Sequence, residues 1–137
     1  MGQIRELMTV RPRTVKAGDS IVEAAKLMKG EDSGIAPIVD GDRLVGVLTD
    51  RDIAIRVVAE GRDPRETKVE EIASQSLVTI DPQQDLDEAL RLMAQHQVRR
   101  LPVVEEDGKL VGIVSQADVA RRTDSERTGE VVQEISE

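Results

Sequence analysis

Apolar residues recur along the chain with two different periods, which predict helices and strands in alternation. Two stretches carry them at helical spacing, and each follows a residue suited to cap a helix, Ser20 or Asp85. The expected buried faces are Ile21, Ala24, Ala25 and Met28 in the first helix, and Leu86, Ala89, Leu90 and Met93 in the second. Gly30 is expected to end the first helix.

Runs rich in valine and isoleucine predict strands after each of these helices. They cover 35–39, 44–49, 101–104 and 110–114. An Asp-Gly pair separates the two members of each couple, which is typical of a β-hairpin. Each second run leads into a further helix, one over 50–60 and one after Ser115. We expect Ile53, Val57 and Val58 to face inward, short strands at 14–15 and 77–80, and a connector at 9–13.

The whole pattern occurs twice. Residues 44–52 match 110–118 at a shift of 66, and the upstream positions match at a shift of 65. Each repeat then reads strand, helix, strand, strand, helix. Its sheet, covered by helices on one face, leaves an apolar face for the other repeat. The predicted fold is α+β, with two tandem β-α-β-β-α repeats packed face to face around a pseudo-twofold axis.

The expected boundaries follow from the repeat. They are 1–62 for the first repeat, 63–68 for a linker, 69–122 for the second repeat and 123–137 for a polar connector and C-terminal helix. That last helix would carry Val131, Val132 and Ile135 on one side. It is too short to hold alone in water, so we expect it to pack on the body or on a second copy, or to fray.

Composition narrows the function. The 137 residues include no cysteine and carry a formal charge of −8, so we expect no disulfide, no thiolate metal site and no nucleic-acid partner. No apolar run approaches the ~20 residues of a membrane span, and no signal peptide is visible, so a cytoplasmic protein without a membrane partner is expected. Phe, Tyr and Trp are absent, so a purine would have to lie between aliphatic side chains and backbone.

The start of each last helix combines a hydroxyl with a carboxylate, in the pairs Thr49/Asp52 and Ser115/Asp118. Either pair can be a capping box and nothing more, worth about 1 kcal/mol. The alternative is a ligand site, because a helix start offers N–H groups to phosphate and a carboxylate can accept from both ribose hydroxyls. The residues alone leave both interpretations open.

Arg99 and Arg100 precede the first strand of the second hairpin, where the first repeat has Gly34 and Ile35. They can be solvated surface arginines, or one can close on a phosphate. In the second case the second repeat should favour anions. His96, the single histidine, has no nucleophile or metal partner in the sequence, and no phosphate-binding loop or metal pattern appears. Hydrolytic catalysis is therefore the least favoured function.

These residues resemble the CBS domain family, and the chain is similar to stand-alone tandem CBS pairs (Bateman modules) of the bacterial hypoxic-response type. The resemblance rests on Gly46-Val47-Leu48-Thr49 with Asp52, Gly112-Ile113-Val114-Ser115 with Asp118, and Pro37 and Pro102. It implies a regulatory protein, not an enzyme, that binds AMP, ADP, ATP or S-adenosylmethionine in clefts between repeats. It also implies that the protein forms homodimers and that it requires no cofactor or metal.

The resemblance assigns residues to two clefts. The main cleft comprises Thr79, Arg99, Arg100, Leu101, Pro102, Ser115 and Asp118, and the second cleft comprises Thr14, Ile35, Ala36, Pro37, Thr49 and Asp52. By this resemblance, Asp118 and Asp52 would hold the ribose hydroxyls, and Ser115 and Thr49 would meet phosphate. The adenine would be enclosed by the neighbourhoods of Thr79 and Leu101-Pro102 in one cleft and of Thr14 and Ala36-Pro37 in the other. The leading hypothesis is an energy or stress sensor read by an unknown protein partner. The alternative is a dimeric interaction protein of the stress response whose clefts stay empty.

Overall fold

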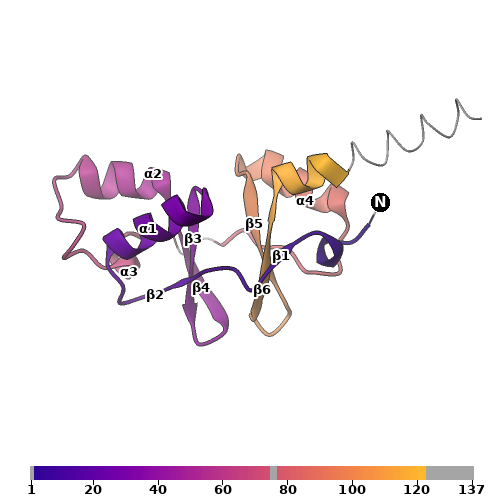
Figure 1. The fold of residues 1–137 in the computed structure, drawn as a ribbon, viewed down its shortest axis with the longest axis horizontal. Helices are drawn as coiled ribbons and strands as arrows, with labels where there is room; N and C mark the ends of the chain where they lie inside the picture. The colour runs from indigo at the N-terminus through magenta and orange to yellow at the C-terminus, as the bar shows by residue number, and fades with distance from the viewer. Residues whose placement is uncertain (1, 75–76, 123–137) are drawn as a thin grey trace, which may run out of the picture.

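The computed structural model describes residues 2–74 and 77–122, and its α+β architecture divides into two halves that lie side by side (Figure 1). The first half contains β2 (Val15–Lys16), α1 (Ile21–Glu31), β3 (Ile35–Asp40), β4 (Arg43–Thr49), α2 (Asp50–Ile53), η2 (Ala54–Val58) and α3 (Val69–Ile72). The second contains η1 (Ile4–Glu6), β1 (Thr9–Val10), α4 (Leu86–His96), β5 (Arg100–Val104), β6 (Leu110–Ser115) and a helix from residue 116 to 122. The expected C-terminal helix lies outside the described residues.

Each half is built on a three-stranded sheet with an antiparallel hairpin. In the first half the order is β2-β3-β4, with β2 parallel to β3. In the second half the order is β1-β6-β5. The short strand expected at 77–80 is reduced to one parallel bridge between Ile80 and Val103. Both hairpins were predicted from their apolar runs and turns.

The expected connector at 9–13 is wrong in its first two residues, because Thr9 and Val10 form a strand. In β1, Thr9 pairs with Ile113 and Val10 with Gly112, which places the start of the chain on the second half. The corresponding contact in the first half is an isolated bridge between Ser74 and Val47. Local sequence does not reveal such a partner, since pairing between distant segments is set by the tertiary fold.

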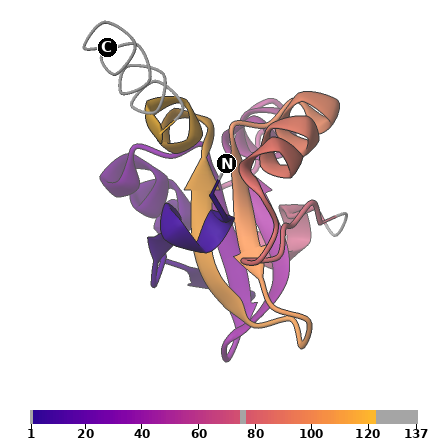
Figure 2. The ribbon, with the colours of Figure 1, turned by 90° about the vertical axis from the view of Figure 1, so that its right-hand side faces the viewer.

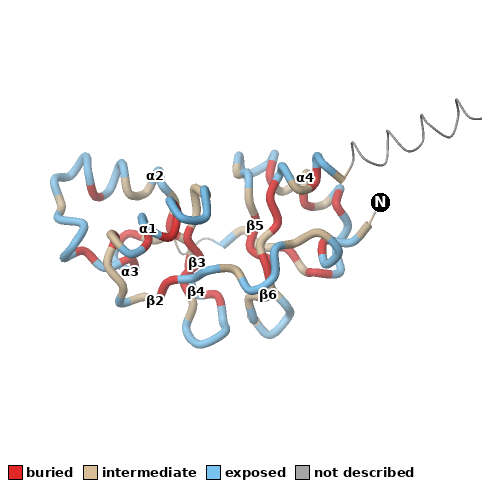
Figure 3. The backbone as a smooth tube through the Cα atoms, viewed as in Figure 1, coloured by how far each residue is buried: buried red, intermediate tan, exposed pale blue. Residues whose placement is uncertain are grey.

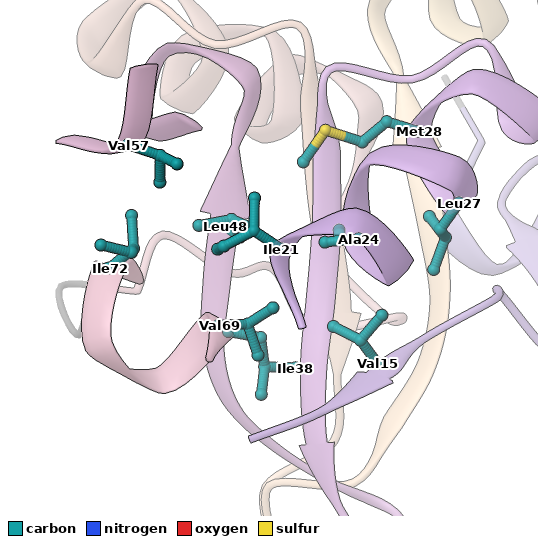
Figure 4. Packing of buried hydrophobic residues seen from close by; sticks show 11 residues of the cluster. Val15, Ile21, Ala24, Leu27, Met28, Ile38, Leu48, Val57, Val69 and Ile72 are labelled. Carbon is teal, nitrogen blue, oxygen red and sulfur yellow. The ribbon is translucent and has the colours of Figure 1, made fainter. Parts of the chain in front are cut away.

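The opening segments of the two repeats are exchanged between the halves. Ile4 is fully buried in the second core, and its N–H donates to the Gln84 carbonyl over 2.9 Å. In return, Val69 and Ile72 are buried in the first core, among the side chains of Figure 4. Each core therefore contains residues from both repeats, and the halves cannot separate without exposing buried apolar surface.

The two long helices begin as predicted, but the first ends later than expected. Ser20 Oγ accepts from the Glu23 N–H over 3.3 Å, and Asp85 Oδ1 from the Glu88 N–H over 2.9 Å. Helix α1 runs through Gly30 to Glu31, and the capping residue Asp32 that follows has a left-handed φ of 48°. Its face also differs from the expectation, because Ala25 is exposed and Leu27 is buried in its place.

The helix expected over 50–60 changes its winding. After α2 it widens into the π-helical stretch η2, in which the Ala59 N–H bonds to the Ala54 carbonyl. Val57 is buried, but Val58 is 70% exposed, so the prediction that Val58 faces inward is wrong. A wider turn rotates the residues that follow away from the face set by a period of 3.6. Ile55 is also 48% exposed. Figure 3 shows exposed backbone along most of the helix labelled α2.

The tips of the two hairpins are joined by reciprocal backbone hydrogen bonds. The Leu44 N–H donates to the Gly108 carbonyl over 3.0 Å, and the Leu110 N–H donates to the Asp42 carbonyl over 2.9 Å. The two bonds are equivalent under the 66-residue shift. Figure 2 shows both turns together at the lower end of the molecule. No helix within the described ranges is long and apolar enough to traverse a bilayer.

Glu71 in α3 predicts a measurable effect of pH on stability. The Lys68 backbone N–H and the Arg62 guanidinium, at 2.7 and 2.8 Å, lower the pKa of Glu71 below its usual range. A carboxyl with a lowered pKa stabilises the fold above its unfolded pKa, about 4.3, and this stabilisation is lost as the pH falls. We expect Glu71→Gln to be less stable than the wild type at pH 7, with the difference narrowing toward pH 3 in urea titrations. A constant difference across that range would contradict the assignment.

Candidate functional site

A cavity of ≈ 170 Å³ opens at the seam between the halves, beside the start of β3. It is called here the first-repeat cleft, and its lining is Thr9, Pro12, Arg13, Leu27, Glu31, Ser33, Ile35, Pro37, Arg100 and Ile113. Most of these residues come from the first repeat, whereas Arg100 and Ile113 come from β5 and β6. The cleft therefore depends on both repeats, and any relative movement of the halves changes its shape.

Strand alternation decides which of the expected residues reach this cleft. Ile35 and Pro37 in β3 line it, although Pro37 is itself buried, whereas the Ala36 side chain between them packs into the first core. In β5, Arg100 reaches the cleft and its neighbour Leu101 is fully buried in the second core. The side chains of Ala36 and Leu101 are thus unavailable to a ligand, and only their backbones remain as candidates.

The guanidinium of Arg100 crosses the seam. Its Nη2 donates to the Asp32 carbonyl over 3.0 Å, at the left-handed residue that ends α1. The main cleft expected from the sequence, called the second-repeat cleft from here on, included Arg100, but the structure brings the Arg100 side chain to the first-repeat cleft, which was the second cleft of that expectation. Arg99 is exposed and does not line this cleft, and its carbonyl accepts the Gln116 N–H over 2.7 Å.

Arg13 lines the cleft and was missed by sequence reasoning. Its Nε lies 3.7 Å from Glu31 Oε1, and 60% of its side chain is exposed. A comparison of the two repeats contains the signal, because the position equivalent to Arg13 is Val78. Arg13 differs from its counterpart in the second repeat, so a search for residues shared by both repeats does not find it.

The Thr49/Asp52 pair forms a complete capping box. Thr49 Oγ1 accepts the Asp52 N–H and Asp52 Oδ2 accepts the Thr49 N–H, each over 3.0 Å. The Asp50 N–H donates to the Gly34 carbonyl, and the Arg51 N–H to Asp50 Oδ1. The expectation of free N–H groups at this helix start is therefore wrong, because local partners already occupy them. The Thr49 hydroxyl proton and Asp52 Oδ1 remain free among the described residues.

The Ser115/Asp118 pair is more fully engaged. Asp118 Oδ2 accepts the Ser115 N–H over 3.3 Å, and Ser115 Oγ accepts the Asp118 N–H over 3.0 Å. Asp118 Oδ1 also forms an ion pair with Arg121. The residue equivalent to Arg121 in the first repeat is Ile55, so Asp52 lacks this competitor. Asp52 and Asp118 occupy equivalent positions, but among the described residues only Asp52 has a carboxylate oxygen, Oδ1, without a partner.

The remaining candidates do not line the first-repeat cleft. Thr14 is exposed before β2, Thr79 is half-buried, and the Pro102 carbonyl accepts the Ile80 N–H over 3.1 Å. Thr49, Asp52, Ser115 and Asp118 lie outside the lining as well. Positions 74–78 of the second repeat correspond to 9–13, and residues 75–76 fall outside the described ranges.

A family model matches the chain twice, and two curated proteins are similar to it over most of their length. The model of the CBS domain family matches residues 4–59 and again 69–124. The CBS domain-containing protein YhcV of Bacillus subtilis is 44% identical over 137 residues, covering 99% of this chain and 96% of that protein. Hypoxic response protein 1 of Mycobacterium tuberculosis is 42% identical over 122 residues, covering 88% and 85%.

Three solved structures have the same fold. Hypoxic Response Protein I with two coordinated zinc ions has a TM-score of 0.79 and 41% identity, covering 87% of this chain and 97% of that one. CBSX2 in complex with AMP has a TM-score of 0.80 and 26% identity, with 93% and 99% coverage. The CBS domain pair of MJ0100 with 5′-methylthioadenosine and S-adenosyl-L-methionine has a TM-score of 0.80 and 28% identity, with 92% and 98% coverage.

This sequence offers few of the nitrogen and sulfur ligands that zinc ions, such as those of the first of these structures, usually take. The sequence has no cysteine and one histidine, His96, which is exposed in the last turn of α4. Within residues 2–74 and 77–122, no three His, Cys, Asp or Glu side chains gather in a way that could hold a metal ion. The residues present thus do not fit a zinc site of the usual nitrogen and sulfur ligands.

Proposed function

Because this chain belongs to the CBS domain family and carries two copies of the domain, we propose that it binds an adenosine-containing ligand in the clefts between its repeats. The resemblance and the tandem α+β fold expected from the sequence are confirmed by the family match and the shared structures. The chain is a CBS-pair regulatory protein. In our proposal it is a cytoplasmic homodimer, without catalysis, that reports energy or stress state to a protein partner.

The observation that carries this proposal is the cleft at the seam, lined by both repeats in a fold whose relatives hold AMP or 5′-methylthioadenosine with S-adenosyl-L-methionine. Ile35, which is half-buried, provides aliphatic surface for an adenine in a protein without aromatic residues, and the buried Pro37 beside it would add to that surface only if the cleft widens. Asp52 Oδ1 is the acceptor proposed for ribose, and the Thr49 hydroxyl is a donor for phosphate. The matching roles proposed in the second repeat fall to Asp118 and Ser115.

The size of the cleft links binding to regulation. Its ≈ 170 Å³ is smaller than the roughly 300 Å³ at which small-molecule sites begin. A nucleotide must therefore widen the seam, and widening moves Arg100 relative to the Asp32 carbonyl that it contacts. In this way occupancy would change the relative position of the two halves, which a partner can detect.

Calorimetric titration with adenosine, AMP and ADP tests the binding proposal. We expect Asp52→Asn to lower affinity at least about tenfold, since its amide oxygen preserves the cap but its NH₂ group replaces the ribose acceptor. Asp118→Asn is the matched variant in the second repeat. If the wild type binds none of these ligands, the proposal is overturned. If the wild type, Asp52→Asn and Asp118→Asn bind them with equal affinity, the two aspartates do not hold the ribose.

Absorbance provides a simple independent check. With no Trp, Tyr or Phe, the pure protein is nearly transparent at the wavelengths where purines absorb. A purine carried through purification would therefore appear as a distinct ultraviolet band and could be identified by mass spectrometry.

A second function is supported by one observation, the exposed apolar pair Ile55 and Val58 on η2. In this alternative the clefts stay empty, and the surface between two copies is the working part. Sedimentation of the wild type and of Val58→Glu distinguishes the two, because a dimer that depends on this surface should dissociate in the variant. Nucleotide uptake by the same samples would favour the sensor.

A further inference from the structure

We propose that the first-repeat cleft is the one that takes a phosphorylated ligand, and that Arg13 and Arg100, one from each repeat, close on its phosphate. This inference rests on the proposed function and assigns the ligand class of one cleft. It reverses the expectation from the sequence, in which the Arg99–Arg100 pair made the second-repeat cleft the anionic site. The two arginines line one cavity although 87 positions separate them in the chain.

Arg13 is free to engage a ligand. Most of its side chain is exposed, and its one ion partner within residues 2–74 and 77–122, Glu31, lies at 3.7 Å without a hydrogen bond between them. An exposed ion pair of this kind contributes about 0–1 kcal/mol, so a phosphate can replace the carboxylate at little cost. The guanidinium also lies against Gly30, where a Cβ would come within 2.9 Å of its Nη1, so the absent side chain leaves room for it.

Arg100 has a donor to spare and a partner that is easily exchanged. To the part of the chain that the structure describes, its side chain gives one hydrogen bond, from Nη2 to the Asp32 carbonyl, and a guanidinium has five N–H donors. A phosphate is a stronger acceptor than a neutral carbonyl, because a hydrogen bond between charged groups is shorter and stronger. Arg100 can thus keep or release Asp32 as it turns toward the ligand.

No other lining group of this cleft can hold an anion as strongly. Ser33 Oγ is already bonded to both the carbonyl and the N–H of Ile35, and Thr9 contributes a neutral hydroxyl. The helix start at Thr49 has its N–H groups occupied, as described above. With Glu31 as the single carboxylate, the lining has a formal charge of +1.

The second repeat lacks this arrangement. Val78 stands at the position of Arg13, and Ile35 stands at the position of Arg100, so the crossing residue supplied by the first repeat is apolar. Its carboxylate Asp118 is also held by Arg121. A nucleoside without phosphate suits such a site better than a nucleotide does. The duplicated clefts would then differ in the charge of the ligand they select.

Titrations with ADP and adenosine on exchanged variants test this inference. Arg13→Val and Arg100→Ile install the residues of the other repeat. Arg11→Gln is the control, because Arg11 is exposed and lies outside the lining, and its replacement removes the same positive charge. We expect each exchange to weaken ADP at least about tenfold, as for a lost charged hydrogen bond, and adenosine less than about twofold. Arg11→Gln should change neither, and thermal unfolding confirms that each variant is folded.

The outcomes separate this inference from the proposed function. Equal losses for ADP and adenosine in the exchanged variants, or no loss, would overturn the assignment of the arginines while leaving nucleotide binding intact. A wild type that binds neither ligand would overturn both. NMR spectra of the methyl groups show which cleft binds ADP. On ADP addition, the methyl signals of Leu27 and Ile35 should shift more than that of Leu92, the equivalent of Leu27. The reverse order would place ADP in the second-repeat cleft.

Discussion

Replacing Gly112 by alanine is expected to destabilise the protein by about 1–3 kcal/mol, the usual cost of forcing an extra methyl into a packed site. A Cβ on Gly112 would lie 2.7 Å from Met8 Sδ and 2.9 Å from the Thr9 carbonyl oxygen. The methionine can turn aside, but the carbonyl belongs to β1, which pairs with β6 at this point. The methyl group must therefore push the first strand away from the second half.

The equivalent glycine provides the matched control. A Cβ on Gly46 would meet Ile38 Cδ1 at 3.4 Å and the Ser74 carbonyl at 3.6 Å, which are ordinary contacts. We expect Gly46→Ala to change stability by less than about 1 kcal/mol in urea unfolding. Equal costs at the two positions would contradict the close approach of β1 to Gly112.

Shortening Ile4 to alanine is expected to cost about 2–5 kcal/mol, the range of large-to-small changes in a core. Residues so close to a chain end are often tolerant to change, but Ile4 is fully buried among second-repeat side chains. Hydrogen exchange should show the loss of protection in β5 and β6 more than in β3 and β4. Chemical unfolding gives the magnitude.

The control for Ile4 lies in the same segment. Val10 is 61% exposed, so Val10→Ala should change stability by no more than about 0.5 kcal/mol. A small cost at Ile4, or a loss of protection confined to the first half, would show that the opening segment does not belong to the second core.

Local chemistry explains which parts of the fold sequence reasoning could predict. The hairpins follow from alternating apolar runs around glycine turns, and the helix caps follow from single side chains such as Ser20. The pairing of Thr9 with Ile113 and the burial of Ile4 could not be predicted, because they join segments that no local pattern relates. The turn of Val58 toward solvent was missed for a different reason, since a π-helical stretch changes the period on which the prediction rested.

The site shows the same division. The hydroxyl and carboxylate pairs were found because they repeat, and their geometry as capping boxes was one of the two interpretations left open. Arg13 was overlooked because it does not repeat, and the direction of the Arg100 side chain is a property of the seam. Ala36 and Leu101 were included by motif, although strand alternation from Ile35 and Arg100 predicts that they face the cores.

The paired bonds between the hairpin tips determine how the two halves can move. Backbone atoms form both bonds, so the one replacement that removes a donor directly is proline at Leu44 or Leu110, since proline has no backbone N–H. The bonds join the halves at the end of the strands farthest from the start of β3. A rotation of the halves about this joined end would displace the turns least and the cleft most. A ligand in the cleft would therefore act on the halves at the greatest distance from the point where their hairpins are joined.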